Sequence, residues 1–195
     1  QICCHPMLAG GKKSLGSGKT SSLFEVLEPL YAGGHKVLVF SQFVEMLKIL
    51  KTELEEKGRP YFMLTGQTTN RGDVVEAFHA CKEPAVFLLS LKAAGTGLNL
   101  TSASYVVLYD PWWNPAVEAQ AIDRTHRIGQ DRTVIAYRLV TRGTVEEKIW
   151  RLQQSKAQLA QDVLGEEGFT GSLSKQDFDY LLEDSSDELE PAEEK

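Results

Sequence analysis

Five short apolar runs, separated by stretches with a different repeat, constrain the fold of this 195-residue chain more than any other feature. The runs cover residues 36–41, 61–65, 85–90, 104–109 and 134–140. Their apolar character is continuous, as in parallel strands that are buried on both faces. Helical spacing of apolar residues lies between them, over residues 42–56, 70–80 and 116–127. This alternation predicts an α/β fold with one right-handed parallel sheet and helices on both faces.

Three further helices are expected outside these units. Ser17 or Thr20 begins the first, because the apolar residues that follow recur at helical spacing. The second covers residues 144–164 and opens on Thr144, close to a capping box. We expect it to pack back across the domain as a brace. A short amphipathic helix over 172–182 completes the set.

Polar residues follow the apolar runs at the same end of each. They are Ser41, Gln42, Thr65, Gly66, Ser90, Lys92 and Asp110. In parallel α/β sheets, ligands collect beyond the carboxyl ends of the strands. These residues are therefore candidates for a binding site, and the alternative for each is that it caps the start of the next helix.

The segment after Pro115 carries the densest set of candidate residues. Pro115 suits the first position of a helix, and Gly129 suits its end. Gln120, Arg124 and Arg127 are four and three residues apart, so they share one helical face. Two guanidinium groups beside an amide suit an anion. The alternative is a solvated helix whose arginines are neutralised by acidic residues of the same segment, Glu118 and Asp123.

The net charge of −6 does not suit a nucleic-acid-binding protein at first sight, but the excess lies at one end. Seven acidic residues follow position 182, against the single Lys195. The first 182 residues carry twenty acidic and twenty basic residues, which permits a local basic groove. Residues 183–195 are expected to form a disordered acidic tail.

Three cysteines, Cys3, Cys4 and Cys81, argue against both a disulfide framework and a zinc site. Their number is odd and no Cys-x-x-Cys spacing occurs, so a reducing compartment and no bound metal are expected. No apolar run approaches the roughly 20 residues of a membrane span, and no secretory or transit segment opens the chain. We therefore expect no membrane association.

The stretch from Gly16 to Thr20 contains Gly-Lys-Thr, as a phosphate-binding loop does. The complete pattern needs a glycine at position 13, where this chain has Lys13, and no clear strand precedes the stretch. A self-sufficient P-loop nucleotidase that uses Lys19 is therefore the weaker alternative.

Residues Gln120 to Gln130 resemble motif VI of the Swi/Snf-type DNA translocases, which are superfamily-two helicase-like ATPases. The resemblance implies the second, C-terminal RecA-like lobe of such a motor. It also implies that Arg124 and Arg127 act as arginine fingers, with Gln120 beside them, on ATP held by the other lobe. Compact loops between the motifs look like those of bacterial or archaeal members.

Other segments resemble further motifs of the same family. Phe40 to Phe43 resembles motif IV, Leu64 to Thr68 the Gly-x-Thr segment, and Ser90 to Leu100 motif V. The resemblance implies DNA-backbone contacts from Ser41, Gln42, Thr65, Gly66, Arg71, Ser90 and Lys92. It places Gly95, Gly97 and Asn99 towards the nucleotide. Ala77 departs from the pattern, since relatives often have a basic residue there, so one peripheral contact is in doubt.

The resemblance also implies how the chain is divided. Residues 1–19 resemble the lead-in from a first lobe, 20–142 form the RecA-like domain, 143–182 hold the brace and short helix, and 183–195 are the tail. ATP and Mg²⁺ are expected to be held mainly by that first lobe, which is absent from this sequence. The expected partners are that lobe and the backbone of double-stranded DNA, bound by a monomer without sequence preference.

The function expected from these motifs is that of a motor lobe in a DNA-stimulated ATPase, inactive in ATP hydrolysis by itself, that remodels protein–DNA complexes. The location would be the bacterial cytoplasm, at the nucleoid, or the nucleus in a eukaryote. Two alternatives stay open: a non-catalytic RecA-like module that only binds nucleic acid or protein, and the P-loop nucleotidase already described.

Overall fold

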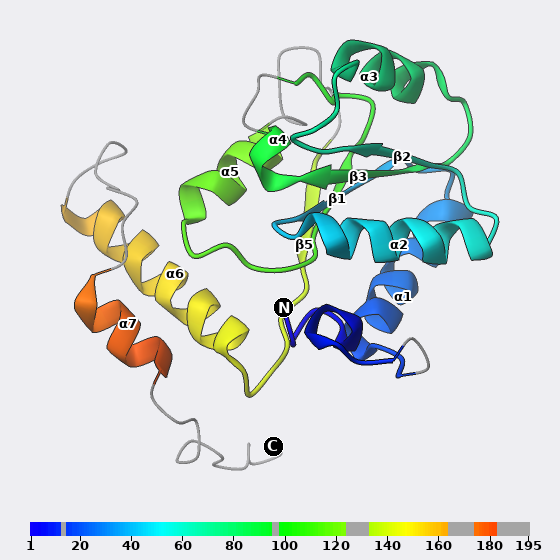
Figure 1. Ribbon diagram of the computed structural model, residues 1–195. Helices are drawn as coiled ribbons and strands as arrows, with labels where there is room; N and C mark the ends of the chain where they lie inside the picture. The colour runs from blue at the N-terminus through cyan, green and yellow to red at the C-terminus, as the bar shows by residue number, and fades with distance from the viewer. Residues whose placement is uncertain (13–14, 95–97, 124–132, 164–173, 183–195) are drawn as a thin grey trace, which may run out of the picture.

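A five-stranded parallel sheet forms the centre of the protein (Figure 1). The computed structural model describes residues 1–12, 15–94, 98–123, 133–163 and 174–182. The strands are β1 (Val37–Ser41), β2 (Tyr61–Leu64), β3 (Val86–Ser90), β4 (Tyr105–Leu108) and β5 (Ile135–Arg138). They lie in the order β2-β3-β1-β4-β5, and every neighbouring pair is parallel. All five predicted strands and their parallel pairing are confirmed.

Helices cover both faces of the sheet, as predicted. Val37 and Val39 point into a core cluster with α1 (Gly18–Ala32) and α2 (Val44–Glu56). Leu38 and Phe40 point into the opposite cluster. That second cluster is shared with α3 (Arg71–Ala80), α4 (Leu91–Ala94) and α5 (Pro115–Asp123). Both kinds of side chain in β1 are fully buried, which explains why the run is apolar without alternation.

Aromatic residues fill the second cluster. The rings of Phe78 and Phe87 lie 4.8 Å apart between centroids, and both side chains are fully buried. Phe62 contacts Phe78 edge-on at 5.5 Å. Burial of each such side chain contributes about 1.5–3 kcal/mol. These ring contacts pack α3 against β2 and β3.

The starts of α1 and α5 agree with the sequence pattern, whereas no side-chain hydrogen bond caps the start of α2 or α3. The Ser17 side chain accepts a hydrogen bond from the Thr20 N–H at 3.3 Å, so α1 begins after Ser17. Pro115 is the first residue of α5. Two short elements were not expected, the 3₁₀ helix η1 (Pro6–Ala9) and α4. Each has four residues, too few for a periodic apolar pattern.

Two helices beyond β5 lie side by side, α6 (Val145–Val163) and α7 (Lys175–Leu182) (Figure 1). The Gly143 N–H donates to Glu147 at 2.8 Å at the start of α6. Lys156 of α6 donates to Asp177 of α7 at 2.5 Å. The helix predicted over 172–182 begins at Lys175 as described, and residues 164–173 lie outside the described part of the chain.

Several predictions fall on residues that the structure does not describe. They are Gly95, Gly97, Arg124, Arg127 and the tail 183–195. None of the described helices is both long and apolar enough to cross a membrane.

Candidate functional site

The predicted polar residues meet along one edge of the sheet. Ser41 and Ser90 end adjacent strands and are register partners. Leu64 pairs with Leu89, so Thr65 follows β2 beside Ser90. Phe40 pairs with Leu108, and the Tyr109 N–H donates to the Phe40 carbonyl oxygen at 2.9 Å. The carboxyl ends of β1, β2, β3 and β4 therefore bring motif-bearing loops from across the sequence together.

Two hydroxyl groups in this row serve the local backbone. Ser41 is fully buried, and its Oγ accepts the Phe43 N–H at 3.1 Å. Ser90 is 3% exposed, and its Oγ accepts the Ala93 N–H at 3.4 Å at the start of α4. The capping alternative thus describes their contacts in this conformation.

The turn after β2 is held by its own side chains. The Thr65 N–H donates to Thr68 Oγ1 at 3.0 Å. Arg71 donates from Nε to the Thr68 carbonyl oxygen and from Nη2 to the Gly66 carbonyl oxygen, each at 3.1 Å. Gly66 itself is exposed. Arg71 therefore shapes the Gly-x-Thr turn, whose exposed backbone is the part open to a ligand.

Asp110 connects the loop after β1 to the loop after β4. Its Oδ2 accepts the Gln42 N–H at 3.1 Å, and Gln42 Nε2 donates to the Pro111 carbonyl oxygen at 3.2 Å. Asp110 is 2% exposed, and burial raises the pKa of its carboxyl group, against the opposing effect of hydrogen bonds from Ser41 and Gln42. Hydrogen bonds therefore connect motif IV directly to the loop after β4.

Three predicted side chains face solvent around this edge. Lys92 lies on α4, Asn99 lies after the motif V loop, and Gln120 lies on α5, and each is exposed. The Asn99 carbonyl oxygen is 2.9 Å from His79 Nε2 of α3. Lys92, Asn99 and Gln120, like the exposed backbone of Gly66, are therefore placed to meet a ligand without rearrangement.

Glu118 does not have the role that the solvated-helix alternative requires. It is 2% exposed and forms an ion pair with Arg138 of β5, at 3.2 Å from Nε to Oε2. Asp123 is exposed. On the inward face of α5, Ala121 is fully buried and Val117 packs partly against the second core cluster, as expected. Glu118 is therefore not available to neutralise Arg124 or Arg127.

Lys19 is also engaged elsewhere. Its ammonium group forms a buried ion pair with Glu146, at the start of α6. The Thr141 N–H also donates to this carboxylate, at 3.0 Å. Sequence reasoning missed the pair, although a cation in the first turn of a helix is electrostatically unfavourable and so is a weak signal. The pairing disfavours the alternative in which Lys19 binds a phosphate.

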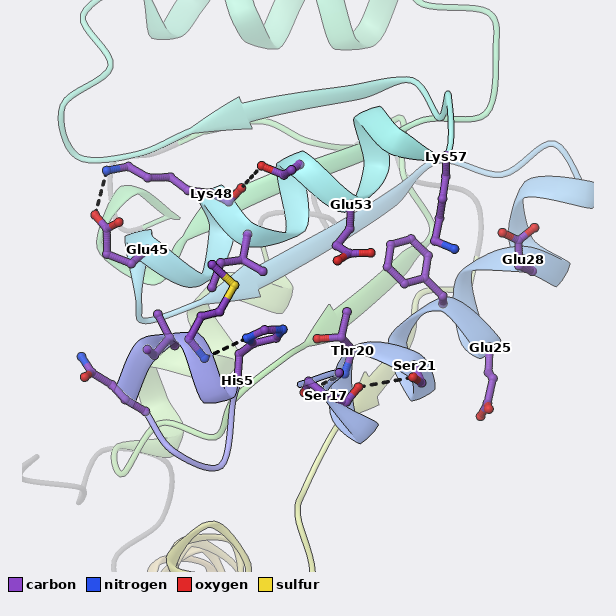
Figure 2. A pocket seen from close by; sticks show the side chains of 17 residues that line it. His5, Ser17, Thr20, Ser21, Glu25, Glu28, Glu45, Lys48, Glu53 and Lys57 are labelled. Carbon is purple, nitrogen blue, oxygen red and sulfur yellow. Dashed lines mark hydrogen bonds and ion pairs between the residues drawn. The ribbon is translucent and has the colours of Figure 1, made fainter. Parts of the chain in front are cut away.

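A cavity of about 880 Å³ lies apart from the motif loops, between the chain start, α1 and α2 (Figure 2). His5 lines it and is 4% exposed, and its Nδ1 accepts the Met7 N–H at 3.2 Å. Burial lowers the His5 pKa, while Glu53 across the cavity opposes that change. Lys57 lies over the Phe24 ring at 4.8 Å. Among the described residues, none of the predicted site residues lines this cavity.

Within the described ranges, no group of three or more His, Cys, Asp or Glu residues could hold a metal ion. The three cysteines are free thiols.

Comparison with known proteins shows the family to which this chain belongs. The family described as helicase conserved C-terminal domain matches residues 18–129. An ATP-dependent helicase of Mycoplasma pneumoniae, described as uncharacterized, is 38% identical over 170 residues, 86% of this chain and 16% of its own length. The chromatin-remodeling ATPase INO80 of Candida albicans is 43% identical over 151 residues, 76% of this chain and 11% of its own length. Similarity is thus not confined to the bacterial or archaeal type.

A solved structure agrees with this relationship. The Sulfolobus solfataricus SWI2/SNF2 ATPase core in complex with dsDNA superposes with a TM-score of 0.72 at 34% identity, covering 93% of this chain and 39% of that chain. The present chain spans less than a fifth of either curated relative and less than half of this ATPase core. It belongs to the helicase conserved C-terminal domain family and is the RecA-like C-terminal domain of the Snf2-type ATP-dependent helicases and translocases.

Proposed function

We propose that this domain is the second motor lobe of an ATP-dependent translocase that is stimulated by double-stranded DNA. The observation that carries the proposal is the register of the sheet. Ser41 and Ser90 are partners, and Thr65 follows β2 beside them, so three motifs lie on one edge. α5 begins after the neighbouring strand β4 and carries Gln120. A single edge can therefore serve both nucleotide and DNA.

In the nucleotide role, Arg124 and Arg127 would meet the γ-phosphate of ATP held by another lobe. Guanidinium groups placed there offset the charge that develops during phosphoryl transfer, an effect worth about 10³–10⁵ in rate. Gln120, Gly95, Gly97 and Asn99 would complete this side. The Lys19–Glu146 pair supports the view that the chain has no P-loop lysine of its own and does not hydrolyse ATP alone. Mg²⁺ would be held with ATP by that other lobe.

In the DNA role, the loops after β1, β2 and β3 would grip one strand through its phosphates. Exposed Lys92 and the exposed backbone of Gly66 support this placement. Gln42 and Arg71 hold these loops in shape through hydrogen bonds. The hydroxyl groups of Ser41, Thr65 and Ser90 would contact DNA only after the hydrogen bonds that they now form within the protein have broken. Contacts to phosphate carry no sequence information, so binding would depend on salt rather than sequence.

The decisive experiment compares Arg124→Ala with Lys92→Ala in a protein that contains both lobes. We expect Arg124→Ala to lower DNA-stimulated ATP hydrolysis by about 10³-fold or more while DNA affinity is retained. Lys92→Ala should weaken DNA binding and reduce its salt dependence, with hydrolysis restored at saturating DNA. Gln154→Ala, at an exposed position of α6, serves as the matched surface control.

Three outcomes would contradict the proposal. Loss of both hydrolysis and DNA binding in Arg124→Ala would mean that this arginine is not specific to the nucleotide. Hydrolysis by the isolated domain would mean that it holds a complete active site. Unchanged hydrolysis in all variants, with DNA binding still lost in Lys92→Ala, would favour the module that only binds.

A further inference from the structure

Glu118 is a buried carboxylate that none of the predicted motif roles uses. It lies in the first turn of α5 and is 2% exposed. Its Oε1 accepts hydrogen bonds from the Trp112 backbone N at 2.8 Å and from Gln153 Nε2 at 3.0 Å. Its Oε2 accepts from Arg138 Nε at 3.2 Å. Four elements therefore meet at one side chain: the loop after β4, α5, β5 and α6.

The charge and the hydrogen bonds of Glu118 restrict the position of α5. Removal of a carboxylate from water costs several kcal/mol unless charge and hydrogen bonds compensate. Arg138 supplies the charge, and the position of Glu118 in the first turn of α5 is favourable towards the helix dipole. A shift of α5 by even a fraction of a helical turn would break these hydrogen bonds. Glu118 thus fixes both the position and the rotation of α5.

Gln153 brings α6 into the same junction. It is 4% exposed, and its Nε2 donates to Glu118 and also to the Trp112 carbonyl oxygen. The next residue, Gln154, is exposed to solvent. α6 is therefore connected directly to α5 and to the loop after β4, in addition to its connection with α1 through Glu146 and Lys19.

The rotation of α5 about its own axis determines which of its side chains lie on the exposed face. Glu118 and the fully buried Ala121 are three residues apart and define the inward face. Gln120 lies on the exposed face of the same helix. Arg124 directly follows Asp123, the last described residue of α5. The junction at Glu118 therefore holds the helix that directly precedes Arg124 in the sequence.

We propose that Glu118 is a positioning residue for the arginine-bearing segment, and that Gln153 makes the location of α6 a determinant of ATP hydrolysis. This inference rests on the proposed function of Arg124. Misplacement of a catalytic group by about 1 Å can cost about 10²-fold in rate, even when the changed residue is remote. The brace helix would then regulate turnover through a hydrogen bond rather than only add stability.

The test uses the protein with both lobes and measures kcat and KM for ATP at saturating DNA. Gln153→Ala removes the bond from α6, and Glu118→Gln keeps the size of the side chain while it removes the charge that pairs with Arg138. We expect both to lower kcat by about tenfold or more, with KM and DNA affinity changed less than twofold. Gln154→Ala is the matched control, because it removes the neighbouring glutamine, which is exposed, and should leave kcat unchanged.

A double-mutant cycle with Arg124→Lys separates positioning from general loss of structure. If Gln153 acts through Arg124, its substitution should have little further effect in the Arg124→Lys background. Thermal melts fix a temperature at which every variant is folded. A lower melting temperature with unchanged kcat, or effects that multiply fully in the cycle, would overturn the inference. Unchanged hydrolysis in Arg124→Lys and Arg124→Ala would instead overturn the proposed function.

Discussion

Lys19 and Glu146 form a buried ion pair between residues that stand 127 positions apart in the sequence. Each lies in the first turn of its helix, α1 and α6 respectively. The Lys19 ammonium also lies 5.6 Å from the centroid of the Tyr109 ring, at the end of β4. The pair therefore joins the start of the domain, the edge of its sheet and the brace helix.

Lys19→Met should destabilise the domain by about 3–5 kcal/mol, because it leaves the Glu146 carboxylate buried without its cation. Urea unfolding followed by circular dichroism gives the change in the free energy of unfolding. The double variant Lys19→Met/Glu146→Gln should recover much of the loss. Lys48→Ala is the control, since its pair with Glu45 is exposed and contributes at most about 1 kcal/mol. Equal effects at Lys19 and Lys48 would contradict the buried role.

Tyr109→Phe should cost about 0.5–1.5 kcal/mol for each hydrogen bond that it removes. The hydroxyl donates to the Cys4 carbonyl oxygen at 2.9 Å and lies 3.0 Å from Thr20 Oγ1. The same unfolding experiment measures the loss. Tyr61→Phe removes an exposed hydrogen bond to Glu55 and should change stability far less. A Tyr109→Phe variant as stable as the parent would mean that this network adds nothing to the fold.

The Cys4 thiol should resist alkylation in the folded protein. Burial, then the nearby Asp110 carboxylate, raise its pKa from 9.0 to about 12, so the reactive thiolate is scarce at neutral pH. Cys3 and Cys81 are partly exposed and should react first, as mass spectrometry of iodoacetamide-treated protein would reveal. All three should react after unfolding. Rapid labelling of Cys4 in the folded state would contradict its burial.

The same raised pKa gives an alkaline dependence of stability. Because the folded state favours the protonated thiol, the contribution of Cys4 to stability is complete below pH 9.0 and is lost as the pH rises towards about 12. A Cys4→Ala variant should lack this part of the pH dependence. Unfolding midpoints measured across that interval in both proteins provide the comparison.

The contact between α6 and α7 should weaken in acid. Burial of Asp177 acts to raise its pKa, but hydrogen bonds from Lys156 and Ser174 outweigh that effect, and the net pKa lies below 3.8. The lowered pKa means that the stabilisation is present above the unfolded value and is lost as the pH falls through the folded one. NMR signals of Tyr180 should therefore shift towards unfolded values below about pH 3.8.

Asp177→Asn provides the control for this acid dependence. The amide keeps the size of the side chain but cannot form the ion pair with Lys156. The Tyr180 signals should be perturbed already at neutral pH, with no further titration in the acid range. A titration that persists in the variant would assign the transition to another group.

Much of the candidate site could be predicted from the sequence, because the patterns that indicate it lie within short stretches of the chain. The polar residues after each strand are visible in the sequence, and parallel pairing requires that they share an edge, as Ser41 and Ser90 do. The sequence does not show which of these hydroxyl groups cap a helix, because capping depends on the backbone geometry a few residues away. The sequence also permits the alternative in which Glu118 is a surface partner of the arginines, because the burial of Glu118 depends on β5 and α6.

The sequence by itself determined the strands, the helices on both faces of the sheet and the family, since continuous apolar runs, helical spacing and dense motifs are all properties of neighbouring residues. The tertiary structure alone decided the pairing of Lys19 with Glu146 and the junction of Glu118 with Gln153. Those contacts join residues 127 and 35 positions apart, and a lone charged residue in a sequence carries no signal of the partner that the fold will bring to it.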